Sequence, residues 1–304
     1  MSIGTEPALQ TSDGLRLHVD VTGDDDPDVT VVLAHGWTQS SETWRYQVRD
    51  LVGAAGARLR LVRYDHRGHG RSDGTAEADA TVQNLATDLG RVIDTFAPEG
   101  PLVLAGHSMG GMAIMALAEQ RPELFAERVV GALFVSTSGG GLDRVTLGLP
   151  RRMGERLRNR LPRLLAARAR MLTRRRRRRP PTIESQVVRR FLLGKPQRLA
   201  DHRVVLADLV ATPADSMCGF FSDLMRHDRA AALAALETVP TRIMVGDCDR
   251  LTAPGHSRRL AASMPWADLD VLAGAGHMLP LERDGAVTEA LAAMVASRES
   301  PHPS

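Results

Sequence analysis

One short pattern limits the possible folds of this chain more than any other: a serine between glycines, at the junction of a predicted strand and a predicted helix. The residues are Gly106-His-Ser108-Met-Gly110-Gly, a G-x-S-x-G motif between the apolar run 101–105 and the helical run 109–120. Small flanking residues allow a tight strand-to-helix turn that lifts the hydroxyl above the sheet edge. We therefore expect Ser108 to be a nucleophile, the alternative being a structural Gly-rich turn.

The rest of the chain alternates short β-branched runs with longer amphipathic stretches, which is typical of a mostly parallel sheet covered by helices. Residues near Leu9 and 15–21 are expected to form an edge hairpin around Asp13-Gly14. The apolar spacing of residues 82–96 predicts a helix, capped by Thr81 or Asp79. The remaining predicted strands are 29–34, 59–64, 101–105, 129–136, 241–245 and 269–272.

A serine hydroxyl needs a base to take its proton and an acid to orient that base. After a turn of this kind the acid and then the histidine are expected at later strand ends. Asp249 follows the strand 241–245, and His277 follows the strand 269–272. We favour Asp249 as the acid over Asp247, which we interpret as a turn-forming residue.

Four other histidines lie in predicted turns near the same sheet edge, and each is interpreted as a hydrogen-bonding scaffold residue. These are His35, His66, His69 and His107. The expected oxyanion donors are the backbone amides of Met109, at the start of the helix after Ser108, and of Trp37, in the loop after the strand 29–34. Gly36 would let that loop approach closely, although Gly36-Trp37 could also be only a turn.

Charge divides the chain sharply. Residues 139–227 carry 21 Arg or Lys against 7 Asp or Glu, whereas the remainder carries 18 basic and 29 acidic residues. Apolar positions in the basic segment recur at helical spacing, with helices expected at 183–193, 198–210 and 213–225. We predict that 139–227 is an Arg-rich helical cap inserted into an α/β core made of residues 1–138 and 228–304.

The motifs occur in the order seen in the α/β-hydrolase superfamily, which this chain resembles over nearly all of its length outside the cap. The motifs are Leu33-Ala-His-Gly-Trp37, Arg63-Tyr-Asp-His-Arg-Gly-His-Gly-Arg-Ser-Asp73, Gly106-His-Ser-Met-Gly-Gly111, Gly246-Asp-Cys-Asp249 and Gly274-Ala-Gly-His277. The resemblance implies an eight-stranded, mostly parallel sheet with helices on both faces and a cap over a Ser-His-Asp triad, with Asp249 as its acid. In the second of these motifs, residues 63–73, Arg67, Arg71 and Asp73 are interpreted as a structural turn network.

The resemblance is to the esterase, lipase and cofactor-free haloperoxidase branch. Epoxide hydrolases and haloalkane dehalogenases carry Asp where this chain has Ser108, which argues against both of those activities. We expect a serine hydrolase of carboxylic esters that works through an acyl-enzyme. A thioesterase, a C–C bond hydrolase or a perhydrolase would use the same triad, and a small-ligand binding protein with vestigial turnover is the alternative from another class.

The predicted helix 213–225 carries an apolar stripe that either lines the substrate pocket or only packs the cap on the core. Its members are Met217, Phe220, Phe221 and Leu224. The run 174–179 consists of six arginines, for which a solvated loop is the simplest interpretation. The basic and apolar stripe 157–172 could instead rest on an anionic lipid surface, and the charge could attract an anionic substrate or an acidic acyl carrier.

Composition excludes several other classes of protein. Two cysteines, Cys218 and Cys248, are too few for a disulfide framework and lack the spacing of a zinc site. No apolar run approaches the roughly 20 residues of a membrane span. We expect a cytoplasmic protein without metal or cofactor, and no nucleic-acid partner because the arginines lack interleaved aromatics. Oligomeric state is left open.

Overall fold

The computed structural model describes residues 8–144 and 182–297, with isolated positions at 152–154, 156, 160, 164 and 167. In this part of the chain the strands form one sheet in the order β1-β2-β4-β3-β5-β6-β7-β8. β1 and β2, and β2 and β4, pair antiparallel, and the other neighbours are parallel. The expected eight-stranded, mostly parallel sheet is confirmed.

The strands are β1 (Ala8–Gln10), β2 (Arg16–Gly23), β3 (Val29–Ala34), β4 (Leu59–Tyr64), β5 (Leu102–His107), β6 (Val129–Val135), β7 (Thr241–Gly246) and β8 (Asp268–Leu272). The α-helices are α1 (Arg45–Ala54), α2 (Val82–Phe96), α3 (Met109–Gln120), α4 (Pro122–Glu127), α6 (Thr182–Val187), α7 (Leu199–Ala211), α8 (Ala214–Leu224), α9 (Pro254–Ser263), α10 (Leu279–Glu282) and α11 (Asp284–Ser297). Short 3-10 or π-helical turns are η1 (Ser41–Trp44), η2 (Glu77–Asp79), η3 (Leu142–Arg144), η4 (Val188–Leu192) and η5 (Ala230–Leu236).

Two apolar cores lie on opposite faces of the sheet because successive side chains of a strand point to opposite sides. Val31 and Leu33 of β3 enter one core with Leu51 of α1 and Leu291 of α11. Val32 of the same strand enters the other core, which contains α2 and α3. Both faces are therefore covered by helices, as expected for parallel strands.

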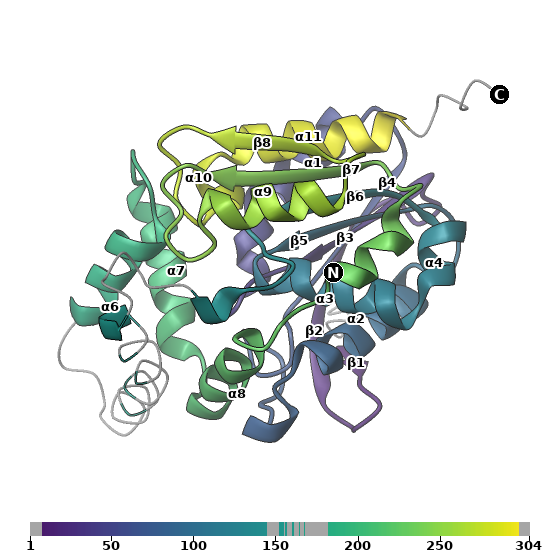
Figure 1. Ribbon diagram of the computed structural model, residues 1–304. Helices are drawn as coiled ribbons and strands as arrows, with labels where there is room; N and C mark the ends of the chain where they lie inside the picture. Colours follow the sequence, from purple (N-terminus) through teal and green to yellow (C-terminus); the bar gives the residue numbers. More distant parts are fainter. Residues whose placement is uncertain are drawn as a thin grey trace.

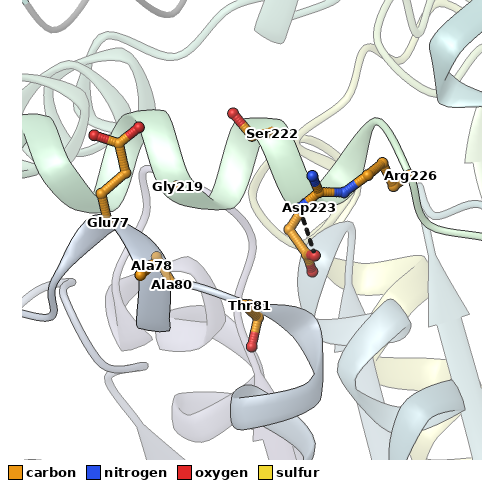
Figure 2. Close-up of a pocket in the computed structure, with 8 residues that line it drawn as sticks. All are labelled: Glu77, Ala78, Ala80, Thr81, Gly219, Ser222, Asp223 and Arg226. Carbon is orange, nitrogen blue, oxygen red and sulfur yellow. Dashed lines mark ion pairs between the residues drawn. The ribbon is translucent and has the colours of Figure 1, made fainter.

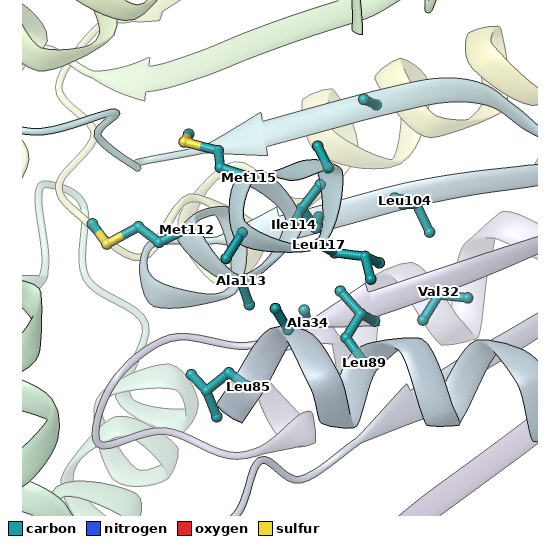
Figure 3. Packing of buried hydrophobic residues seen from close by; sticks show 14 of the residues in the cluster. Val32, Ala34, Leu85, Leu89, Leu104, Met112, Ala113, Ile114, Met115 and Leu117 are labelled. Carbon is teal, nitrogen blue, oxygen red and sulfur yellow. The ribbon is translucent and has the colours of Figure 1, made fainter. Parts of the chain in front are cut away.

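The helix α3, which follows Ser108, is buried almost all round. Figure 3 shows its residues Ala113 and Leu117 beside Leu85 and Leu89 of α2. Met112 and Met115 are buried in the same core, which agrees with a packing role for both methionines. The turn that carries Ser108 therefore rests on a rigid helix.

The helices α6, α7 and α8 lie beyond the end of the sheet toward which β7 and β8 point (Figure 1). We call residues 182–227 the cap segment. The ends of the predicted insert lie side by side, because the Arg229 amide donates to the Gly139 carbonyl at 2.8 Å. The division into a core and an inserted cap stays a prediction. The run 174–179, and all of the stripe 157–172 apart from the isolated positions, lie outside the described residues.

No single helix in the described ranges is both long enough and apolar enough to cross a membrane, and only the pair α7 and α8, bent by 99° at their junction, meets that test together.

Candidate active site

Ser108 occupies a strained turn between β5 and α3. Its φ of +52° lies in a region that side chains other than glycine rarely adopt, at a cost of about 1–3 kcal/mol. The turn is held on both sides, since the Ser108 amide donates to the Val135 carbonyl at 2.9 Å and its carbonyl accepts from the Thr137 hydroxyl at 2.7 Å. The side chain is half-buried, so it is available to a ligand.

Asp249 and His277 form a buried pair at the carboxyl end of the sheet. Asp249 Oδ2 lies 2.9 Å from Nδ1 of His277, and the two residues are 4% and 2% exposed. Asp249 also accepts from the Thr252 amide and hydroxyl, at 3.0 and 2.8 Å. Burial by itself raises the pKa of Asp249, but the His277 ring and the Thr252 hydroxyl outweigh it and hold this pKa below its usual value. A carboxylate that orients an imidazole is the result.

Asp247 takes no part in this pair. Its side chain is exposed, and Oδ1 accepts from the Gly274 amide at 2.7 Å. Asp247 therefore joins the loops after β7 and β8. The interpretation of Asp247 as the residue whose side chain forms the turn is wrong, because the carboxylate that closes the local turn is that of Asp249, onto the Leu251 amide at 2.8 Å.

The backbone around His277 connects this residue to the Ser108 turn. Nε2 of His107, the residue before Ser108, donates to the His277 carbonyl at 2.8 Å. Burial lowers the pKa of His107 to about 3, so its ring is neutral and acts as a brace. Within the described ranges no hydrogen bond joins the Ser108 hydroxyl to His277. The structure thus pairs Asp249 with His277 directly and brings Ser108 to the same sheet edge.

The two predicted oxyanion donors lie on segments that touch. A side chain at Gly110 would overlap the Ala34 carbonyl, so glycine there lets the start of α3 press against the end of β3. This contact brings Met109 close to the loop that contains Trp37. Neither the Met109 amide nor the Trp37 amide donates a hydrogen bond to any described residue. Both remain predictions as oxyanion donors.

The three other histidines near this edge form a buried cluster of rings that are tilted or edge-on to one another. The His35 ring lies 4.4 Å from the His66 ring and 5.5 Å from the His69 ring. Burial lowers the pKa of all three, to about 3 for His69. His69 Nε2 accepts from the Thr38 amide at 3.1 Å, which fixes the loop after Trp37. Neutral, internally bonded rings match the scaffold interpretation.

The apolar stripe of α8 divides between two surroundings. Phe220 is fully buried in the core beneath the sheet, 5.3 Å from the His69 ring. Phe221 is half-buried, 5.6 Å from the Trp37 ring, and Met217 packs in a smaller apolar cluster with Met278. Phe220 therefore packs the cap on the core, whereas Phe221 and Met217 lie beside loops of the candidate site.

Two cavities lie away from these residues. One of about 640 Å³ is lined by Arg189, Lys195, Pro196 and Gln197. The other, of about 400 Å³, lies between α8 and the turn before α2; Figure 2 shows Glu77 near Gly219 at one end of it and Thr81 below Asp223 toward the other. Neither is lined by Ser108, Asp249 or His277. In the described part of the chain no cluster of three or more His, Cys, Asp or Glu side chains could hold a metal ion.

Two residues of the site escaped the sequence analysis. Glu282 binds the backbone of the His277 loop, and Thr252 donates its hydroxyl to Asp249. A helical Glu and a Thr after an Asp carry no distinctive pattern. Only their position five and three residues after His277 and Asp249, respectively, could have drawn attention to them.

Comparison with known proteins places this geometry in context. Residues 31–290 match the model of a family described as the alpha/beta hydrolase family. A monoacylglycerol lipase of Mycolicibacterium smegmatis is 29% identical over 252 residues, which cover 81% of this chain and 80% of that protein. A polyketide synthase of Burkholderia thailandensis is 28% identical over 257 residues, but the chain spans only 11% of its length. A solved thermophilic esterase from Thermogutta terrifontis superimposes with a TM-score of 0.75 at 22% identity, over 98% of this chain and 100% of that one.

Proposed function

Because this chain belongs to the alpha/beta hydrolase family, we propose that it is a serine hydrolase that cleaves carboxylic esters through an acyl-enzyme. The coarse assignment as an esterase-like or lipase-like hydrolase follows from the family and the relatives. The residues and steps given below are the proposal.

In the proposed reaction the Ser108 oxygen attacks the ester carbonyl while Nε2 of His277 takes the hydroxyl proton. Asp249 holds the imidazole through Nδ1–H and stabilises the positive charge that forms on it. The Trp37 and Met109 amides donate to the tetrahedral oxyanion. His277 then gives the proton to the leaving alcohol, and a water activated by the same base releases the acid from Ser108.

The buried hydrogen bond between Asp249 and His277 is the observation that carries this proposal. An acid and a base in direct contact, on loops after two neighbouring strands, are what a serine nucleophile at that edge requires. The strained Ser108 turn supports the same reaction, and so do the Trp37 and Met109 amides, which donate to no described residue. In an apo enzyme the bond between nucleophile and base is often long, and substrate closes it.

The apolar cluster above the site supports an uncharged acyl group as the part of the substrate that is bound. Met278 follows His277, and Met217 and Leu209 of the cap segment pack around it with Trp37 at the edge. Burial of such a group contributes about 25 cal/mol per Å² of apolar surface. The cluster itself is buried, so the apolar surface left for an acyl chain is that of the half-buried Trp37 and Phe221 rings, 5.6 Å apart. We propose an ester with an apolar acyl chain.

A fluorophosphonate probe tests the proposal directly, because it reacts only with an activated serine. Wild-type protein should be labelled at Ser108, and Ser108→Ala should abolish labelling and lower kcat for p-nitrophenyl esters by several orders of magnitude. Ser263→Ala, at an exposed position on α9, is the matched control and should behave as wild type. Folded wild-type protein that stays unlabelled would instead indicate a ligand-binding protein. A parallel series of acyl thioesters compares the two leaving groups.

A further inference from the structure

The chain of the cap segment runs directly beside the loop that carries His277. We call residues 192–195 the strap and residues 274–278 the histidine loop. The amide of His277 itself donates to the carbonyl of Leu192 in the strap at 2.9 Å. The backbone of the proposed base is therefore bonded to the cap on one side and, through its carbonyl, to His107 on the other.

The strap can lie so close only because its centre has no side chain. A Cβ at Gly194 would overlap the Gly274 carbonyl and the Gly276 amide. The Lys195 amide donates to the Gly274 carbonyl at 2.8 Å, which adds a second backbone bond between the two segments. Any movement of the strap away from the core must break bonds to the histidine loop.

One carboxylate closes this junction. Glu282 Oε2 accepts from the Gly194 amide at 2.6 Å and from the Gly276 amide at 3.0 Å. Its Oε1 accepts from the Met278 amide at 2.9 Å. The amides on both sides of His277, and one amide of the strap, thus share a single acceptor group. Hydrogen bonds to a charged acceptor are about twice as strong as neutral ones.

Burial raises the pKa of Glu282 above its usual value, and the three amides and Arg283 oppose that effect. The other titratable groups at this junction are Asp247 and the Cys248 thiol in the loop after β7, Lys195 in the strap, and His277; Asp247 accepts from the Gly274 amide. Protonation of the Glu282 carboxylate would weaken its hydrogen bonds to all three amides at once.

We propose that Glu282 is a positioning residue for the base: it locks the histidine loop to the strap, so that His277 is aligned only while the cap segment is seated. The inference rests on the proposed function, in which His277 is the base. Glu282 itself touches no reacting atom, and it acts through the backbone of the residues that flank His277.

The variant Glu282→Gln keeps the size of the side chain but removes one full acceptor oxygen and the charge. We expect kcat for p-nitrophenyl butyrate, and the rate of fluorophosphonate labelling, to fall about 10- to 100-fold with KM nearly unchanged, as for a misplaced catalytic group. The low-field proton resonance of His277 Nδ1–H, bonded to Asp249, should shift or broaden. The dependence of log kcat on pH should lose the contribution of Glu282 in the variant, because a glutamine side chain does not titrate.

The exposed Glu289→Gln on α11 is the matched control, and it should leave all of these readouts at their wild-type values. Should Glu282→Gln not fold, Glu282→Asp keeps the charge and shortens the reach, and it should show the same changes to a smaller degree. A folded variant with wild-type labelling rate, resonance and pH profile would overturn the proposal, even if its melting temperature were lower. Failure of the proposed function is distinguishable, because the wild-type protein would then not be labelled at all.

Discussion

At the scale of single residues, the two aspartates after β7 show how a two-residue shift separates a structural role from a proposed chemical one. Asp247 is exposed on a loop contact, whereas Asp249 is buried against His277. Sequence order favoured Asp249 as the acid; the structure places its carboxylate on His277, and its catalytic role stays a prediction. The Leu251 and Thr252 amides, two and three residues later, donate to Asp249 Oδ1, and this turn directs the carboxylate toward His277.

The substitution Asp249→Asn tests this assignment. An amide in place of the carboxylate cannot stabilise the imidazolium and favours the wrong tautomer of His277, so we expect kcat to fall about 10³- to 10⁴-fold. The measurement is steady-state hydrolysis of a short p-nitrophenyl ester. Asp247→Asn should lower kcat far less, because Asp247 bonds only the Gly274 amide, three residues before His277, and an asparagine oxygen can still accept that bond. Equal losses in the two variants would contradict the assignment.

Residues that stand in recognisable motifs could be predicted from the sequence, whereas residues outside such motifs could not. Ser108, Asp249 and His277 stand in motifs at strand ends. Glu282 was missed because its importance comes from three backbone amides that only the folded chain brings together. The same holds for Phe220. Helical spacing put it on one stripe with Phe221, but only the packing shows that Phe220 lies in the core that contains α2 and α3, whereas Phe221 lies beside Trp37.

At the scale of elements, periodicity predicted regular segments well and their ends less well. The helix 82–96 has those bounds in the structure, and Thr81 rather than Asp79 caps it through the Asn84 amide at 3.1 Å. The strand expected at 101–105 runs on to His107, because pairing continues to the His107 and Val135 positions of β5 and β6. Such extension depends on the partner strand, which local sequence does not contain.

The helix α7 is attached to the core at two places of different character. Near its start, buried Asp201 accepts from Arg45 and from the Tyr46 hydroxyl, both at 2.8 Å, and from Arg198 at 2.7 Å. Seven residues later, about two helical turns, Asp208 accepts only from the Ser40 hydroxyl among the side chains described, at 2.8 Å. The first attachment is charge-neutralised, and the second is not.

Stability should therefore depend on the ionisation of Asp208. Burial raises its pKa to about 7, and the nearby carboxylates Asp65 and Glu42 add to the effect. The folded chain keeps this proton up to about pH 7, whereas an unfolded chain loses it near pH 4, so the free energy of unfolding should fall as pH rises between these values. Asp208→Asn should remove that dependence and stabilise the protein at pH 8 by on the order of 1–2 kcal/mol.

Thermal unfolding at pH 5 and pH 8 measures this effect. The variant should gain melting temperature at pH 8 relative to wild type and little at pH 5. The exposed Glu237→Gln, at the end of η5, serves as the control and should leave the difference between the two pH values unchanged. A wild-type difference that persists in Asp208→Asn would assign it to another group.

At the scale of the whole molecule, one arginine joins segments that are distant in sequence. Arg67 donates to both oxygens of Asp88 in α2, at 2.7 and 2.8 Å, and to both oxygens of Asp13 in the β1–β2 turn, at 2.8 and 3.1 Å. Arg67 and Asp88 are 2% and 0% exposed. The network links the edge hairpin, β4 and α2, and it agrees with the structural interpretation of this motif.

Removing one partner of a buried ion pair leaves the other charge buried without a partner. Arg67→Met should therefore lower the free energy of unfolding by about 3–5 kcal/mol, measured by urea denaturation. The exposed pair of Arg16 and Asp73, 3.8 Å apart, offers a contrast, and Arg16→Met should cost less than about 1 kcal/mol. Because Arg67 is remote from the reaction, kcat per folded molecule should stay near wild type. A large loss of kcat in folded Arg67→Met would instead give it a role in the reaction.

The global architecture was predictable because several motifs, each tied to a strand end, occur in one order along the chain. Which strands are neighbours in the sheet was not predicted, because that order depends on pairing between segments that are distant in sequence. The cap was less predictable, since its apolar and basic pattern fits several arrangements. The position of the strap against the histidine loop depends on Gly194, a residue that in sequence marks no more than the end of a helix.

The bond from the His277 amide to Leu192 also bears on how this enzyme can be recombined with its relatives. A chimera that exchanged the whole predicted insert would replace a backbone partner of the proposed base together with the predicted cap. A graft that takes residues 192–195 and Glu282 from the same parent keeps the strap and its carboxylate partner together. Crossover points are therefore best placed before η4 and after Lys195. Substrate range and turnover would then be inherited from different parents.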